Sequence, residues 1–100
     1  MRERQFEFEW NEVKAAANAL KHGVSFDLAR TIFNDPFLVT VADLEHSEAE
    51  ERWFSIGRAA NGSLLSVAYL WSEVESATKI RVISARKATR TEIRQYEEVL

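Results

Sequence analysis

The dipeptide Asn61-Gly62, set between two strongly apolar segments, is the feature that most restricts how this chain can fold. Asn-Gly favours the positive-φ positions of a type I′ turn and is the strongest short-range signal for a β-hairpin. The segment that follows it, 63–71, is apolar on both sides of a strand. Its alternating side chains are, on one side, Leu65, Val67, Tyr69 and Trp71 and, on the other, Leu64, Ala68 and Leu70. Such a strand is expected at the centre of a sheet, with both faces covered.

Four further segments carry the alternation or the β-branched content of strands. The predicted strands are therefore 6–10, 37–41, 52–59, 63–71 and 78–85. Asp43 to Glu51 forms an acidic loop between the second and the third of them.

Capping residues predict where the helices begin and end. Asn11 begins a first helix, and Gly23 ends it with a left-handed stop. Ser25 begins a second helix, which ends at Asp35-Pro36 because proline disfavours a helical residue before it. The expected core-facing residues are Val13, Ala16, Ala17 and Leu20 in the first helix and Phe26, Ala29, Ile32 and Phe33 in the second.

The C-terminal segment is predicted to form a third helix. Thr89 and Glu92 make a capping box at its start, and Ile93, Tyr96 and Leu100 mark its buried side. The order becomes β-α-α-β-β-β-β-α in one domain over residues 1–100. This order predicts an α+β fold with an antiparallel sheet packed against two N-terminal helices and a C-terminal helix.

Composition excludes several classes of site. The chain has no cysteine and two histidines, so it has no disulfide framework or cysteine nucleophile, and a structural zinc site is improbable. It shows neither a signal peptide nor an apolar segment long enough to span a bilayer, so we expect a cytoplasmic protein without membrane contact. We expect no cofactor and no metal ion.

The charge of the chain reverses near its C-terminus. The formal net charge is -3, yet six of the thirteen Lys and Arg residues lie between positions 79 and 94, opposed there only by Glu92. These cations are Lys79, Arg81, Arg86, Lys87, Arg90 and Arg94. Such a segment predicts an anion-binding surface, with RNA as the natural ligand. The alternative is a solvated strand and helix whose cations pair with acids elsewhere.

The first helix also has a polar stripe. Lys14, Asn18, Lys21 and His22 lie within about a third of its circumference, opposite the apolar set. His22 lies at the C-terminus of this helix. The negative end of the helix dipole there favours a protonated imidazole, which can contact phosphate or donate a proton. The alternative is an ordinary solvent-facing side.

Two arginines fall within predicted strands. Arg58 and Arg81 on neighbouring strands would form a multi-donor cradle for phosphate. Cross-strand ion pairs with acids such as Glu73 or Glu75 are the alternative. In the acidic loop, the cluster of His46, Glu48, Glu50 and Glu51 matches no metal motif and is interpreted as solvated.

Taken together, several segments resemble one protein family in order and spacing. The most specific are Lys21-His22-Gly23 and Ser84-Ala85-Arg86-Lys87-Ala88. The others are 8–14, 18–26, 33–36, His46-Ser47, Glu51-Arg52, Ile56-Gly57 and 80–89. From about residue 6 to residue 98, the chain is similar to the BrnT family of bacterial toxins.

This resemblance implies a compact fold like that of RelE ribonucleases and a metal-independent, RNA-cleaving toxin that arrests growth. It also implies neutralisation by a small DNA-binding antitoxin of the BrnA type, in a complex that represses its own operon. The chain itself would contact DNA only indirectly.

For this chemistry we predict roles for individual residues. Arg81 and Arg86 would clamp phosphate, assisted by Arg58 or Lys87. His22, or Lys21 with a lowered pKa, would transfer the proton, and Glu51 is the second candidate. Lys79 and Arg90 complete the expected RNA-binding set.

Two other functions remain open from sequence alone. The chain could be a catalytically inert module that binds an antitoxin and acts only as a co-repressor. It could also be a toxin that poisons a protein target such as gyrase.

Overall fold

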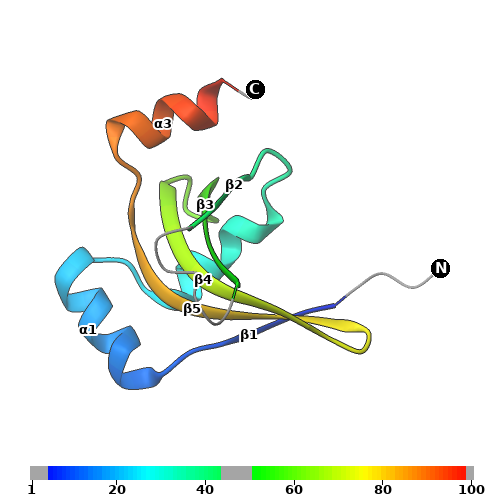
Figure 1. The fold of residues 1–100 in the computed structure, drawn as a ribbon. Coiled ribbons are helices and arrows are strands. Elements are labelled where there is room, and N and C mark those ends of the chain that lie inside the picture. Colours follow the sequence, from blue (N-terminus) through cyan, green and yellow to red (C-terminus); the bar gives the residue numbers. More distant parts are fainter. Residues whose placement is uncertain (1–4, 44–50, 99–100) are drawn as a thin grey trace.

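The computed structural model describes residues 5–43 and 51–98 and contains one five-stranded sheet with helices around it (Figure 1). The elements in chain order are β1 (Gln5–Glu9), α1 (Glu12–His22), α2 (Phe26–Ala29), the 3-10 helix η1 (Arg30–Asn34), β2 (Val39–Ala42), β3 (Glu51–Arg58), β4 (Leu64–Val74), β5 (Ala77–Lys87) and α3 (Arg90–Glu97). The α+β class is as expected. The second helix is one α-turn followed by η1, rather than one continuous helix.

The strands lie in the order β1-β5-β4-β3-β2, so β4 is central, as its apolar sequence predicted. The strands β2 to β5 form an antiparallel meander. β1, however, pairs with β5 in parallel, with Phe8 opposite Ile80, so the expectation of an antiparallel sheet is wrong at this edge. The β4–β5 hairpin leaves the outer edge of β5 open, and β1 fills the part up to Arg81. The parallel direction lets α1, which follows β1, continue along the same edge to Ala85.

The cross-strand register defines two faces of the sheet, because directly opposed residues project to the same side. One face, called here the η1 face, carries Leu65, Val67, Tyr69 and Trp71 of β4. The hydrophobic core lies on this face, where buried Val24, Phe26, Ala29 and Ile32 of the α1–η1 segment pack on it. Gly57 of β3 permits this close packing, since a Cβ there would lie 3.0 Å from Ile32 Cβ.

The opposite face, called here the α3 face, is covered only in part. Ser66 of β4 is buried beneath α3, whose inward residues are Glu92 and Tyr96. Farther along β4, Ala68 and Leu70 are half-buried. Figure 1 shows α3 lying across one end of the bent sheet, with β4 and β5 running on beyond it toward their hairpin. The prediction that β4 is covered on both faces therefore holds for Leu65, Val67 and Tyr69 on the η1 face, where Trp71 is half-buried, and on the α3 face only beneath α3.

The orientation of α1 is the largest departure from expectation. Its expected core residues Val13 and Leu20 are 79% and 91% exposed, and Ala16 and Ala17 are exposed too. Asn18, from the polar stripe, is the residue of α1 that is buried. Its side chain bonds to the backbone of Ala85 on β5, beyond the point where β1 stops pairing. Unpaired backbone groups at that edge need partners, and this need outweighs the burial of Val13, Leu20 and two alanines.

Candidate nucleic-acid interface

A β-bulge in β5 brings the candidate phosphate-binding arginines to the same face. Arg81 and Arg86 are five positions apart, so a regular strand would project them to opposite faces. The register shifts between Ala68 and Tyr69 of β4, whose partners are Ser84 and Val82. Ile83 is therefore an extra residue, and the alternation is reset after it. Arg81 opposes Leu70 and Arg86 opposes Ser66, so both belong to the α3 face.

Arg81 is exposed on this face, and Lys79, opposite Ser72, shares it. On the other side of β5, β1 places Glu9 beside Arg81 and Glu7 beside Lys79. Even so, no ion pair joins Arg81 to another described residue. The surface is thus cationic but flanked by acids, and Arg81 keeps its donors available for an anionic ligand. The expected partners of Arg81, Glu73 and Glu75, lie elsewhere along the β4–β5 hairpin.

Arg86 is held by an acid of α3. Its two terminal nitrogens donate to the Glu92 carboxylate at 2.7 and 3.0 Å, in a bidentate pair. Burial alone would raise the pKa of Glu92, but the bonds from Arg86 and from the Thr89 backbone, with the charge of Arg86, lower it overall. The bonds to Glu92 and its negative charge raise the pKa of Arg86. Glu92 also completes the predicted capping box, so one carboxylate both starts α3 and fixes Arg86.

Arg58 also projects to the α3 face and, like Arg86, contacts a side chain of α3. Its guanidinium donates to Gly62 O at 2.8 Å and lies 5.8 Å from the centre of the Tyr96 ring. The Tyr96 hydroxyl in turn donates to Asp35 Oδ2 at 2.7 Å, and the Arg58 backbone N–H donates to the same oxygen at 2.8 Å. Neither Tyr96 nor Asp35 was predicted in this role from sequence. Asp35 before proline indicated only the end of a helix.

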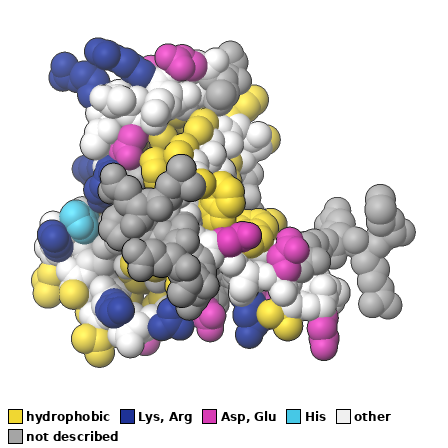
Figure 2. All heavy atoms as spheres, viewed as in Figure 1, with side chains coloured by type: hydrophobic (Ala, Val, Ile, Leu, Met, Phe, Trp, Pro, Cys, Tyr) yellow, Lys and Arg dark blue, Asp and Glu magenta, His cyan; other side chains and the backbone are white. Residues whose placement is uncertain are grey.

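Helix α1 brings its C-terminal histidine toward β5. Asn18 fixes the helix against Ala85, the residue before Arg86. His22 is one turn beyond Asn18 on the same side of α1 and is partly buried, whereas Lys21 is exposed. Figure 2 shows a histidine with Lys and Arg side chains nearby along this side of the molecule, and further Lys and Arg side chains over α3.

The structure separates the remaining candidates from this group. Glu51 opposes Trp71, and Lys87 opposes Leu65, so both project to the η1 face, away from Arg81. Arg90 is exposed at the first position of α3, beyond the sheet. His46, Glu48 and Glu50 lie outside the described residues. Ser84 lies between the two arginines on the α3 face, and it was assigned no role in the site from sequence because no pattern in the chain marks the bulge.

Two features bear on other classes of site. Within residues 5–43 and 51–98, no three His, Asp or Glu side chains gather closely enough to hold a metal ion. In the same part of the chain, every helix is too short or too polar to cross a membrane.

The fold and this face define a small α+β protein with a cationic sheet surface beside a C-terminal helix. The family model described as "Ribonuclease toxin, BrnT, of type II toxin-antitoxin system" matches residues 10–92. The chain therefore belongs to the BrnT family of ribonuclease toxins of type II toxin–antitoxin systems.

Comparison with solved structures agrees with this fold. The chain is similar to the crystal structure of the Brucella abortus ribonuclease toxin BrnT, with a TM-score of 0.59 and 23% sequence identity. The similarity covers 86% of this chain and 99% of that one. No curated protein sequence matches the chain.

Proposed function

We propose that this chain cleaves RNA on the α3 face without a metal ion, and that Arg81 is its principal phosphate contact. The observation that carries the proposal is the bulge at Ile83, which puts Arg86 on the face that Arg81 and Lys79 already share. Arg81 is exposed and has no ion-pair partner among the described residues. Membership of the BrnT family supports ribonuclease activity, and the geometry of the α3 face supports that face as its location.

The reaction requires three functions. The ribose 2′-oxygen attacks the adjacent phosphorus as its proton passes to a base, and a new P–O2′ bond forms. The P–O5′ bond breaks as an acid protonates the leaving 5′-oxygen, which gives a 2′,3′-cyclic phosphate and a 5′-hydroxyl. Cations stabilise the charge of the phosphorane between these steps.

We assign these functions by position. Arg81 and Lys79 contact the phosphate. Arg86, which Glu92 fixes, orients the end of β5, and its N–H groups that do not bond Glu92 donate to the phosphate. His22, on the side of α1 that faces β5, is the proposed proton-transfer group, with Lys21 beside it. Glu51 is a weaker candidate than the sequence suggested, because it projects to the η1 face. The analogy with RelE ribonucleases, which the sequence suggested, is part of this proposal.

The proposal includes an antitoxin partner. A type II system pairs a toxin with an antitoxin, and we propose that a BrnA-like protein neutralises this chain and supplies any contact with DNA.

The test is cleavage of ribosome-free RNA in EDTA by the purified parent, Arg81→Ala, His22→Ala and Arg30→Ala. Arg30 is exposed and pairs loosely with Asp27, so its variant controls for the loss of one positive charge. Loss of a phosphate contact that acts in the transition state should slow cleavage about 10²–10³-fold. We expect this loss for Arg81→Ala, a comparable loss for His22→Ala, and no loss for Arg30→Ala.

Two results would contradict the proposal. Arg81→Ala cutting as fast as the parent would remove the phosphate role. A folded parent that cuts neither free RNA nor RNA on translating ribosomes would favour the inert co-repressor.

A further inference from the structure

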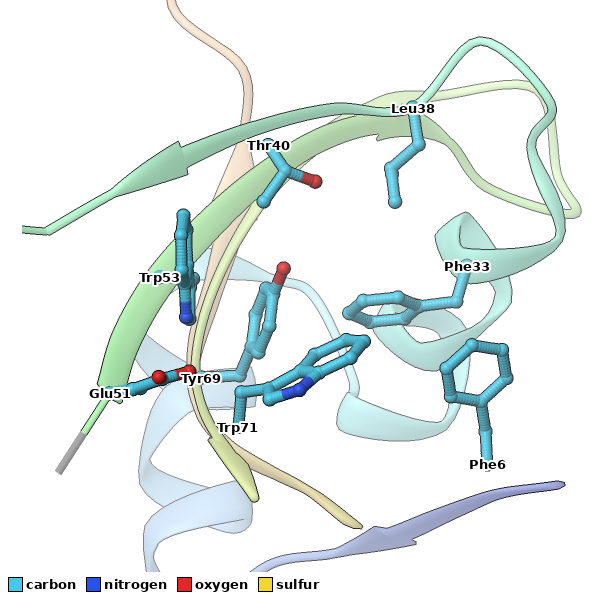
Figure 3. A pocket seen from close by; sticks show the side chains of 8 residues that line it. All are labelled: Phe6, Phe33, Leu38, Thr40, Glu51, Trp53, Tyr69 and Trp71. Carbon is cyan, nitrogen blue, oxygen red and sulfur yellow. The ribbon is translucent and has the colours of Figure 1, made fainter. Parts of the chain in front are cut away.

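A second site lies on the η1 face, where aromatic side chains surround a pocket of about 280 Å³ (Figure 3). The residues that line it are Phe6, Phe33, Leu38, Thr40, Glu51, Trp53, Tyr69 and Trp71. They come from β1, η1, the turn before β2, and strands β2 to β4. The volume of about 280 Å³ lies just below the usual range for ligand sites, which begins at about 300 Å³, and it fits one side chain better than a large ligand.

The walls of this pocket are held by ring contacts. Phe33 packs edge-on against Tyr69 at 5.0 Å, and Phe6 packs edge-on against Trp71 at 6.2 Å. Tyr69 is itself buried and bonds through its hydroxyl to Ser55 at 2.6 Å, so the floor is fixed. Phe6 is 49% exposed, which leaves one side of the pocket open to a partner.

The charged group among the lining residues is the carboxylate of Glu51, and Thr40 adds a neutral hydroxyl. Figure 3 shows the Glu51 carboxylate at the edge of the pocket, below Trp53 and beside Tyr69 and Trp71. A more polar hollow shares Glu51 and Trp71 and continues to Ser72 and Glu73. A carboxylate beside the electron-rich faces of several rings attracts a cation, since both the charge and the ring quadrupoles favour it. The same groups repel a phosphate.

Among cationic groups, arginine fits best. Its planar guanidinium can stack against a Trp ring while two of its N–H groups bond a carboxylate, a combination that lysine reproduces poorly. We propose that this pocket binds an arginine side chain, presented by a basic segment of a protein partner. The inference rests on the protein partner included in the proposed function and is independent of how RNA is cleaved.

Position also separates this site from the RNA surface. Glu51 and Trp71 project to the η1 face, whereas Arg81 and Lys79 project to the α3 face. The pocket and the surface around Arg81 therefore have opposite charge preferences, and an arginine bound in the pocket would not itself contact Arg81.

The test uses the indole N–H signals of Trp53 and Trp71 in NMR spectra of the labelled chain, with Trp10 as an internal reference outside the pocket. The probes are a blocked Gly-Arg-Gly peptide, the same peptide with neutral citrulline in place of arginine, and a fully 2′-O-methylated RNA oligonucleotide that cannot be cleaved. We expect the arginine peptide to shift the Trp53 and Trp71 signals but not that of Trp10. The citrulline peptide should bind at least about tenfold more weakly, because it lacks the charge-assisted bond to Glu51.

Two variants make the test specific. Glu51→Gln keeps the size of the side chain and should weaken binding of the arginine peptide about tenfold or more. Glu97→Gln removes an exposed carboxylate of α3 and should leave binding unchanged.

Four outcomes would overturn the inference. These are equal binding of the two peptides, equal binding by parent and Glu51→Gln, no shift of either pocket indole up to the solubility of the peptide, or displacement of the arginine peptide from the pocket by the oligonucleotide. Cleavage is not measured in this test, so its result is distinguishable from failure of the proposed ribonuclease site.

Discussion

The side-chain amide of Asn18 pairs with the backbone of Ala85 as a neighbouring strand would. Asn18 Nδ2 donates to Ala85 O at 2.8 Å, and the Ala85 N–H donates to Asn18 Oδ1 at 3.1 Å. The second proton of Nδ2 bonds Val24 O at 3.0 Å. An amide is the side chain suited to this position, because it offers a donor and an acceptor in the geometry of a peptide group. One residue thus closes the edge of β5 and fixes α1 next to Arg86.

Asn18→Ala should lower the free energy of unfolding by about 2–3 kcal/mol, because it leaves buried backbone groups of Ala85 and Val24 without partners. Leu20→Ala, two residues away on the same helix, should change it by less than about 0.5 kcal/mol, since Leu20 is 91% exposed. Urea unfolding of both variants measures the difference. A larger loss for Leu20→Ala than for Asn18→Ala would mean that α1 packs by its apolar face after all.

Acid should weaken the attachment of α3 through Glu92. The folded pKa of this carboxyl is lowered from its ordinary value of 4.5, so its stabilising contribution is complete above that value and is lost as pH falls through the lower, folded pKa. Glu92→Gln should lower the free energy of unfolding at neutral pH by about 1 kcal/mol, a modest figure because Arg86 is 42% exposed. It should also flatten the dependence on pH below 4.5. Unfolding of parent and variant across this range, with Glu97→Gln as the control, gives the slope, and parallel curves would contradict the assignment.

Tyr96→Phe isolates the hydroxyl that joins α3 to Asp35. Burial raises the pKa of Asp35, but hydrogen bonds from the Arg58 backbone, the Tyr96 hydroxyl and the Phe37 backbone bring it below 3.8. Removing the hydroxyl should move this pKa upward and lower the free energy of unfolding by about 1 kcal/mol, while the ring stays in place. An NMR titration of the Asp35 carboxyl measures the pKa. An unchanged value would show that the bond at 2.7 Å contributes little in solution.

The two faces of β5 can be compared by the salt dependence of RNA binding. Arg81 and Lys87 are exposed cations of one strand, but they project to the α3 face and the η1 face respectively. With a 2′-O-methylated oligonucleotide, Arg81→Ala should reduce the slope of log Kd against log salt by about 0.7, the value for one phosphate contact on a single strand. Lys87→Ala should leave the slope unchanged. Equal changes of the slope in both variants would mean that RNA binding depends on the net charge of the chain and not on the α3 face.

Much of the secondary structure follows from local rules that the sequence displays. Asn11, Ser25 and Thr89 cap their helices through side-chain oxygens, and Gly23 adopts the left-handed conformation predicted for it. A hairpin at Asn61-Gly62 does join β3 and β4, but the turn is not type I′, because Gly62 has a positive φ of 89° and Asn61 does not. The Gly62 N–H instead donates to Ala59 O across Ala60 and Asn61. These features depend on neighbours only a few residues away, so composition and spacing suffice to predict them.

Long-range pairing was harder to predict. Helical periodicity chose the apolar face of α1 for burial, but the open edge of β5 selected Asn18 instead. The parallel position of β1 has the same origin, since nothing in 6–10 indicates which strand edge is free.

The sequence by itself determined the elements, the cationic segment near the C-terminus and the family resemblance, because each depends on residue type and spacing. The tertiary structure decided which cations act together. In a strand, side chains alternate between faces, so one extra residue at Ile83 moves Arg86 to the face of Arg81, while Lys87 and Glu51 project to the other. A bulge arises from pairing between strands, and pairing is a property of the assembled sheet.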